Sequence, residues 1–145
     1  MRFILITSSF LLLSLNSSAQ LEKVLHQTFE IGQAEKIELD FAGEYQIELW
    51  AGNTVMTETQ IQVFDASPAI FKHFIEKAKR YDVELNEENE SIAQFYSHDK
   101  VRQEIKTKFG DGSCEEIVVL RIFIPDNFEI VDQKSLVRKP KSTNE

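Results

Sequence analysis

The strongest constraint on the fold lies in residues 37–49, where apolar and polar residues alternate. Every second residue belongs to one set: Ile37, Leu39, Phe41, Gly43, Tyr45, Ile47 and Leu49. Because successive side chains of a β-strand point to opposite faces, this pattern puts the apolar set on one face and mostly acids on the other. Gly43 interrupts the apolar set and allows the chain to turn or bulge there. The sequence therefore predicts two short, half-buried strands joined at residues 42–44.

The first nineteen residues have the features of a secretory signal peptide. A basic start is followed by an almost wholly apolar run over residues 3–15, and Ser17 and Ala19 provide small residues for cleavage before Gln20. The apolar run is about thirteen residues long, whereas a membrane-spanning helix needs about twenty. We therefore expect removal of residues 1–19 and export to the periplasm or the cell surface, without a transmembrane segment; the alternative is an uncleaved N-terminal anchor. A short signal with Gln after the cut resembles those of Gram-negative bacteria.

The chain that remains after this signal has the length of one domain. The sequence contains a single cysteine, Cys114, so no internal disulfide can form and the core must hold without a covalent link. We expect Cys114 to be a small, partly buried apolar residue, with pairing between two chains as the alternative. The predicted organisation is a β-rich domain over residues 20–132 and a disordered basic tail over residues 133–145.

The balance of charge excludes one large class of partner. Without the signal the chain has 15 basic and 24 acidic residues, a net charge of −9, and residues 20–132 carry 11 basic against 23 acidic residues, a net charge of −12. Such an acidic body repels a phosphate backbone, so nucleic acid is not expected as a partner. The four basic residues of the tail are able to contact an anionic surface, but we expect them to be a solvated end.

Residues 67–79 predict a helix. Apolar residues at spacings of three and four form one face, Ser67 suits the N-cap and Pro68 suits the first helical position. The remaining elements are expected to be strands with polar turns between them, at residues 25–31, 55–64, 81–85, 91–96, 101–109, 114–124 and 128–131. Residues 101–109 also fit a helix, but a strand is preferred because a turn with two glycines follows.

Several expectations concern the neighbours of these strands. The strand that ends near Trp50 and the next strand flank Gly52 and are expected to form a hairpin. Residues 81–96 are expected to form a second hairpin. The nearly continuous apolar run at residues 114–124 predicts a strand covered on both faces, and residues 128–131 predict an edge strand. The fold class is therefore mainly β: a single domain of two packed sheets, or a curved, solenoid-like sheet, with one α-helix.

No arrangement of residues in the sequence predicts catalysis, metal binding or a cofactor. His26, His73 and His98 are far apart and lack a recognised ligand spacing, and the neighbours His98 and Asp99 would point to opposite faces of a strand. Residues 111–116 contain acids beside a turn, but not the regular spacing of a calcium loop. Paired carboxylates for acid–base catalysis remain unplaced, because close pairs are uninformative in a chain with so many acids.

The aromatic residues are better candidates for binding. Trp50 follows the alternating segment and breaks its parity, so its side chain is expected to face outward beside the Gly52 turn. Phe95 and Tyr96 are consecutive, so one of them should also face outward. Trp50 and Tyr96 are therefore candidate contacts for a partner or a glycan. For Trp50, the preferred expectation is that its ring caps the core from its rim, and the contact role is the alternative.

Several of these motifs resemble those of a known group of proteins. Ile37-x-Leu39, Gly43-x-Tyr45-x-Ile47, Trp50-x-Gly52 and Val119-x-Arg121-x-Phe123-x-Pro125 are similar to motifs of the adhesin-like families of exported bacterial β-proteins. The resemblance implies stacked, solenoid-like or sandwich-like sheets and a surface role without an established biochemical activity. No catalytic residue can be carried over from it, and the helix at residues 67–79 departs from a continuous solenoid.

The function expected from the sequence is that of an exported, non-enzymatic envelope protein of this adhesin-like type, which acts through its surface on a cell-surface or envelope protein or a glycan. Two alternatives remain open. The first is a small glycan- or ligand-binding module that uses Trp50 and Tyr96, and the second is a hydrolytic enzyme whose carboxylates the sequence does not place. A pocket with two acids in apolar surroundings would favour the enzyme, whereas exposed aromatic residues or unpaired sheet edges would favour binding or adhesion.

Overall fold

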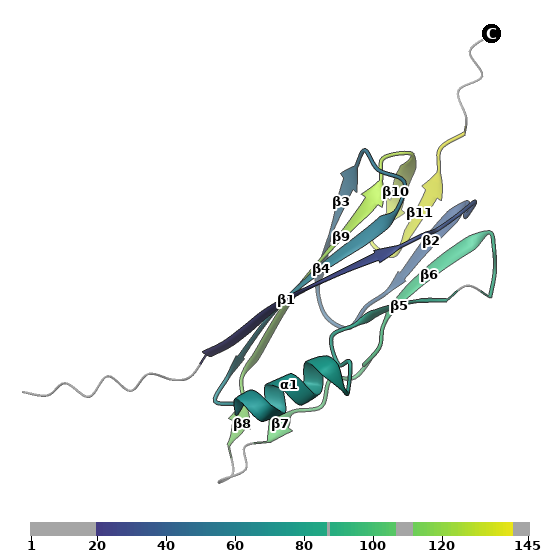
Figure 1. Ribbon diagram of the computed structural model, residues 1–145. Helices are drawn as coiled ribbons and strands as arrows, with labels where there is room; N and C mark the ends of the chain where they lie inside the picture. The colour runs from purple at the N-terminus through teal and green to yellow at the C-terminus, as the bar shows by residue number, and fades with distance from the viewer. Residues whose placement is uncertain (1–19, 87, 107–111, 141–145) are drawn as a thin grey trace, which may run out of the picture.

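The computed structural model describes residues 20–86, 88–106 and 112–140, and in these residues the protein is mainly β with one helix (Figure 1). Sheet I consists, in spatial order, of β1 (Gln20–Phe29), β4 (Val55–Phe64), β9 (Glu116–Pro125) and β3 (Tyr45–Trp50). Sheet II consists of β10 (Phe128–Asp132), β11 (Ser135–Arg138), β2 (Lys36–Asp40), β6 (Ile92–Ser97) and β5 (Val83–Asn86). A two-stranded ribbon contains β7 (Ile105–Lys106) and β8 (Ser113–Cys114), and α1 spans Pro68–Glu76. Of the two predicted architectures, the protein has the pair of packed sheets.

Strands β2 and β3 are the two short strands predicted from the alternating segment, and Gly43 lies between them with a φ of 86°. They belong to different sheets, because the chain crosses from sheet II to sheet I in this connection. Ile37 and Leu39 are almost completely buried between the sheets, as predicted. The prediction was wrong for Leu49, which is 44 % exposed because β3 is the edge strand of sheet I.

The predicted hairpin around Gly52 is wrong, because β9 lies between β3 and β4. Strand β4 pairs with β9 in the antiparallel direction, and β3 pairs with β9 in the parallel direction. The inner-facing residues Leu120, Ile122 and Ile124 of β9 are at most 5 % exposed. A strand with so many apolar residues is most stable in the middle of a sheet, where both of its edges are paired and one face joins the core.

Two further details of sheet I differ from the sequence prediction. Strand β9 is not covered on both faces, because its outer-facing residues Ile117 and Val119 are 42 % and 40 % exposed. Strand β1 begins at Gln20 rather than at residue 25, because β4 provides a partner for every residue of this segment, from Phe64 opposite Gln20 onward. The outer face of sheet I is thus open to solvent at this end.

The long strands of sheet I contact two different partners along their inner face. One half packs against sheet II around a first core, whose most buried residues include Ile37, Val55, Phe95, Ile122 and Leu136. The other half packs against α1 and the ribbon around a second core, which includes Ile61, Val63, Ala66, Tyr81, Ile105 and Cys114. Cys114 is 7 % exposed in this second core, as expected for a small apolar residue.

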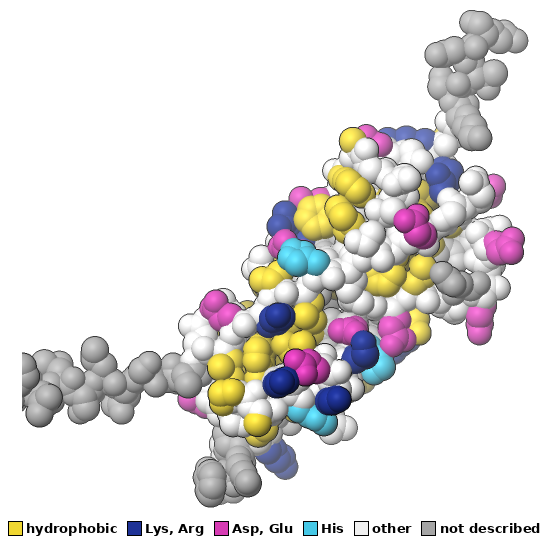
Figure 2. Space-filling model, viewed as in Figure 1, with side chains coloured by type: hydrophobic (Ala, Val, Ile, Leu, Met, Phe, Trp, Pro, Cys, Tyr) yellow, Lys and Arg dark blue, Asp and Glu magenta, His cyan; other side chains and the backbone are white. Residues whose placement is uncertain are grey.

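Helix α1 begins where the sequence predicted. The Oγ atom of Ser67 accepts a hydrogen bond from the backbone N–H of Ile70 at 3.2 Å, and Pro68 takes the first helical position. The helix ends at Glu76, three residues before the predicted end, and Lys79 beyond it has a φ of 49°. None of its residues is fully buried, and Figure 2 shows hydrophobic side chains open to solvent between α1 and β1.

The largest departure from the prediction is strand β11. It lies within the segment expected to be a disordered tail, yet it pairs with β10 on one side and with β2 on the other. Leu136 is completely buried, and the Nε atom of Arg138 donates a hydrogen bond to the carbonyl oxygen of Ala34 at 2.8 Å. The folded domain therefore includes residues 133–138, while residues 141–145 of the expected tail lie outside the described residues.

The other strand predictions agree with the structure in type, and the bounds differ. Strands β5 and β6 form the predicted antiparallel hairpin. Strand β10 is an edge strand of sheet II, as predicted. In the segment 101–109, strand structure is confined to Ile105–Lys106, and residues 107–109 lie outside the described part of the chain.

Gln27 links the edges of the two sheets. Its side-chain amide donates a hydrogen bond to the carbonyl oxygen of Val83 at 3.0 Å and accepts one from the N–H of Val83 at 2.8 Å. We expect Gln27→Ala to lower the free energy of unfolding by about 1–3 kcal/mol, because both backbone groups of Val83 lose their partner. Thr28→Ala, on the exposed face of the same strand, is the matched control in a urea titration. Equal effects of the two substitutions would contradict the link.

Candidate functional site

The side of the sandwich between β3 and β10, here called the lateral side, is bounded by two sheet edges. Strand β3 is an edge of sheet I, strand β10 is an edge of sheet II, and the two lie close together in Figure 1. Two hydrogen bonds link β3 to the turns that flank β10: the Tyr45 hydroxyl donates to the carbonyl oxygen of Gln133, and the Asp126 N–H donates to the carbonyl oxygen of Trp50 at 2.8 Å. The strands are therefore neighbours, although they do not pair with each other.

Two apolar residues on the lateral side face the core but are not covered. Leu49 lies opposite the buried Ile124, and Ile130 lies opposite the buried Leu136, so both point to the inner side of their sheets. They are nevertheless 44 % and 46 % exposed. Inner-facing apolar residues become exposed where the space between the sheets opens to solvent, so the interior is accessible from the lateral side.

A cleft of about 590 Å³ continues the lateral side at the end where the chain crosses between the sheets. Its lining comes from the β2–β3 connection and from the β10–β11 turn: Leu39, Asp40, Phe41, Gly43, Glu44, Tyr45, Ile47, Gln133 and Lys134. The rings of Phe41 and Tyr45 meet edge to face with 4.9 Å between their centroids. The cleft thus combines an aromatic wall with acidic, basic and amide side chains.

Charge and burial control the protonation of two groups in this cleft. The Nζ atom of Lys100 lies 2.9 Å from a carboxylate oxygen of Asp40, and this hydrogen bond and the charge of Lys100 lower the pKa of Asp40. Burial, together with the charges of Asp132 and Asp40, raises the pKa of the Tyr45 hydroxyl. At neutral pH the cleft therefore contains an ionised Asp40 and a neutral phenol that donates a hydrogen bond.

Tyr96, one of the two predicted contact residues, lies next to this cleft. It is opposite Asp40 in the β2–β6 pair, and the ammonium group of Lys100 is 5.4 Å from the centroid of its ring. A hydrogen bond to Glu84 raises the pKa of its hydroxyl, and Glu84 also contacts Nδ1 of His98. Tyr96 faces outward and is half-buried, while its neighbour Phe95 is completely buried, so the prediction that one of the pair faces outward is confirmed.

Trp50, the other predicted contact residue, lies at the far end of β3 from the cleft, and the structure does not bring it together with Tyr96. Its ring is half-buried and its Nε1 atom donates a hydrogen bond to the carbonyl oxygen of Thr54 at 2.9 Å. The ring also lies over Gly52, since a Cβ atom there would be 2.0 Å from Cη2 of the indole. Trp50 therefore holds the β3–β4 turn, and part of its ring remains open to a partner.

The position of the Trp50 ring gives a direct optical test. Gly52→Ala should displace the ring from the turn, because the added methyl group occupies the same space. Trp50 is the only tryptophan in the sequence, so the fluorescence emission of the folded protein should shift to longer wavelength as the indole enters water. Gly43→Ala is the control, since no atom lies within 4 Å of its added Cβ and the indole should not move. An unchanged emission spectrum in Gly52→Ala would contradict this packing.

Phe41 and Tyr45 were not identified as site residues from the sequence. The alternating pattern placed both in the core-facing set, which is correct for the direction of the two strands. The pattern did not show that β2 and β3 enter different sheets, and that crossing forms the cleft that both rings line. An aromatic pair that flanks a glycine, with acids beside it, was the signal present in the sequence.

The described residues contain no group of three or more His, Cys, Asp or Glu side chains placed to hold a metal ion. His98 contacts Glu84, whereas Asp99 binds Arg80 at 3.1 Å. Both residues follow the end of β6 at Ser97, so the expected opposite faces of a strand do not apply to them. Within the same part of the chain, no helix has the length and apolar character needed to cross a membrane. Compared with known proteins, the chain matches no family model, no curated protein sequence and no solved structure.

Proposed function

We propose that this chain is an exported, non-enzymatic protein of the cell envelope, of the adhesin-like type, which holds a surface or envelope partner on its lateral side. The observation that carries the proposal is the uncovered pair Leu49 and Ile130, which face the interior between two sheet edges. Water is excluded from such residues only when another molecule covers them, and the free energy gained by that burial favours association.

The two strands that border the lateral side have little of the usual protection of sheet edges, which is limited to acidic residues in both strands and to a register irregularity between Ile130 and Asp132 in β10. Neither β3 nor β10 contains Lys, Arg or Pro, residues that commonly block the addition of a further strand. On the opposite edge of sheet I, Lys23 of β1 lies opposite the buried Ile61 and so points to the inner face, and Gln27 is bonded to Val83. The lateral side is therefore the side on which an extended partner segment would gain main-chain hydrogen bonds.

Export is inferred from the sequence, because residues 1–19 have the basic start, apolar run and small residues of a secretory signal peptide. All strands that the structure describes lie between Gln20 and Arg138, so cleavage before Gln20 would leave them intact. Mass spectrometry of the protein recovered from the envelope or the medium should give a chain that begins at Gln20. A cytoplasmic protein that retains residues 1–19 would contradict export.

The lowered pKa values of two carboxyl groups favour a role in binding over a role in catalysis. The hydrogen bond and charge of Lys100 lower the pKa of Asp40, and hydrogen bonds to Tyr96 and His98 lower the pKa of Glu84. A carboxyl group that acts as a general acid needs the opposite shift, toward neutral pH. Asp40 and Glu84 thus have the properties of ion-pair partners that present fixed charge to a ligand.

A pair of charge insertions tests the lateral side. Leu49→Lys and Ile130→Lys should each reduce retention of the purified protein on isolated envelopes by at least about tenfold, because a buried, unpaired ammonium opposes contact. Val24→Lys is the matched control, since Val24 is 45 % exposed on the outer face of sheet I. Thermal melting of all three variants separates lost binding from lost folding. Equal retention of the three variants would remove the lateral side as the contact surface.

The cleft favours a second candidate function, a glycan- or ligand-binding module. Aromatic rings stack on the apolar faces of sugars, and carboxylate and amide groups bind their hydroxyls, which is the combination that Phe41, Tyr45, Asp40 and Gln133 present. Oligosaccharides from the envelope should then perturb the NMR signals of residues 39–47 in a saturable manner. Tyr45→Leu should abolish that response, while Trp50→Leu should preserve it. A response that follows Trp50 instead would contradict a site in the cleft.

A further inference from the structure

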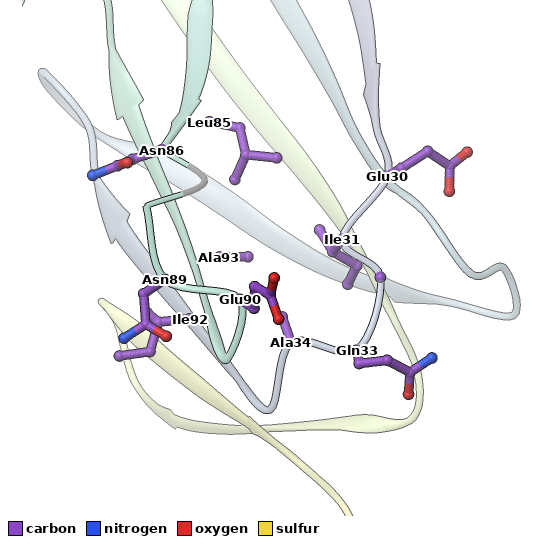
Figure 3. A pocket seen from close by; sticks show the side chains of 11 residues that line it. Glu30, Ile31, Gln33, Ala34, Leu85, Asn86, Asn89, Glu90, Ile92 and Ala93 are labelled. Carbon is purple, nitrogen blue, oxygen red and sulfur yellow. The ribbon is translucent and has the colours of Figure 1, made fainter.

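A second hollow, with a volume of about 520 Å³, lies between the β1–β2 turn and the β5–β6 hairpin (Figure 3). It shares no lining residue with the cleft on the lateral side. Its lining residues belong to the turn that precedes β2 and to the β5–β6 hairpin. The cleft, by contrast, lies at the C-terminal end of β2. We call this hollow the hairpin pocket, and its ligand chemistry is independent of the function proposed for the lateral side.

The floor of the hairpin pocket is apolar and belongs to the first core. Ile31, Ala34 and Ala93 are 7 %, 2 % and 5 % exposed, and the side chain of Leu85 packs against the same core. In Figure 3, the side chains of Leu85, Ile31 and Ala93 converge on the hollow. Two of the floor residues are alanines, so the space that larger side chains would fill stays open to a ligand.

The rim of the hairpin pocket is acidic. Among the described residues that line it, Glu30 and Glu90 are the charged ones, and none is Lys, Arg or His. Figure 3 shows the carboxylate of Glu90 directed over Ala34 and the floor, while the carboxylate of Glu30 points away from the hollow. A group that enters this pocket therefore meets one negative charge directly above an apolar surface.

The β1–β2 turn forms one wall of the pocket, and hydrogen bonds from Arg138, which does not line the pocket, hold its backbone in place. Arg138 donates hydrogen bonds to the carbonyl oxygen of Ala34 at 2.8 Å and to that of Gly32 at 3.3 Å. Its ring contact is with Phe128, 4.6 Å from the guanidinium to the ring centroid. The guanidinium of Arg138 is hydrogen-bonded to this turn, and none of the described side chains that line the pocket provides a basic partner for Glu90. The wall is thus rigid and the charge of Glu90 remains available.

We propose that the hairpin pocket binds an organic ammonium group on an aliphatic stem, with the stem on the Ile31–Leu85–Ala93 floor and the ammonium at the Glu90 carboxylate. A lysine side chain has this shape, with an apolar stem and a charged head, and so does a free alkylamine. The stem gains from burial on the floor, and the head gains a charge-assisted hydrogen bond at the rim without leaving water completely. The two sources share one chemistry, and titration with one probe of each kind distinguishes them.

The test is an NMR titration of the isotope-labelled protein, residues 20–145, with three probes. The probes are n-pentylamine, a blocked tripeptide with a central lysine, and n-pentanol as a neutral molecule of similar size. Both amines should shift the backbone signals of residues 31–34 and 90–93 in a saturable manner, and pentanol should bind about three- to fivefold more weakly, because it lacks the charge that pairs with the exposed Glu90. A tighter response to the peptide assigns the pocket to a protein partner, and an equal response assigns it to small amines.

A charge-neutral variant gives the control. Glu90→Gln should weaken the binding of both amines by about three- to fivefold, the range for a solvent-exposed ion pair, while Glu30→Gln, with the same change in net charge and a side chain that points away, should weaken it less than about twofold. Both residues are exposed, so both variants should keep the fold. Equal binding of pentanol and pentylamine, shifts confined to other residues, or equal effects of the two variants would each overturn the proposal.

Discussion

Replacing Leu136 with alanine should lower the free energy of unfolding by about 2–5 kcal/mol, the range found for large-to-small changes in buried cores. Leu136 is completely buried, and β11 places it between β10 and β2 in the middle of sheet II. The lost side chain would leave a cavity that the paired backbone on both sides cannot close. Denaturant unfolding of the chain from residue 20 onward measures the change.

The neighbour of Leu136 provides a matched control. Val137 is on the same strand but faces outward and is 37 % exposed, so Val137→Ala should cost much less. A chain that ends at Asp132 should fail to fold at all, because β10 and β2 would both lose β11 as their partner strand. A truncated chain with unchanged cooperative melting would show that β11 is dispensable for the fold.

Replacing Arg80 with methionine should cost about 3–5 kcal/mol, because one partner of a buried ion cluster is removed while its acids stay in place. The side chain of Arg80 is 7 % exposed and lies 2.8 Å from a carboxylate oxygen of Glu116 and 3.1 Å from one of Asp99. It also donates to the carbonyl oxygen of Gln103 at 2.6 Å. Removing it leaves the 14 %-exposed Glu116 without its cation.

Arg121 offers a natural comparison for Arg80. It also bridges two carboxylates, Glu48 at 2.7 Å and Glu58 at 3.0 Å, but its side chain is 33 % exposed on the outer face of sheet I. Solvent screens such a pair, so Arg121→Met should shift the unfolding midpoint far less than Arg80→Met. The double variant Arg80→Met with Glu116→Leu should recover part of the loss, since no unpaired Glu116 remains. Equal destabilisation by Arg80→Met and Arg121→Met would contradict the conclusion that Arg80 forms a buried ion cluster.

The local elements of this fold could be predicted from the sequence because local chemistry decides them. Alternation around Gly43 predicted β2 and β3, and the Ser67-Pro68 pair predicted the start of α1. The assignment of strands to sheets depends on long-range pairing, and the same side-chain alternation is compatible with several partners. The insertion of β9 between β3 and β4 therefore required the structure.

Strand β11 was missed for a related reason. Only Leu136 among its four residues is buried, and its flanks are polar and basic, which resembles a solvated end. The candidate site follows the same rule: strand parity predicted that one of Phe95 and Tyr96 faces outward, whereas the cleft beside Tyr96 depends on a crossing between sheets. The direction of a side chain on its own strand was predictable from the sequence. The pairing of strands and the cleft between two sheets were not.

The place of β11 has a consequence for biogenesis. This strand, close to the C-terminus, fills an inner position of sheet II, between two strands made earlier. Sheet II cannot be completed until Ser135–Arg138 has emerged from the ribosome. Strands β2 and β10 are therefore synthesised before the strand that lies between them, so sheet II is completed by a late, long-range pairing step and not in the order of synthesis.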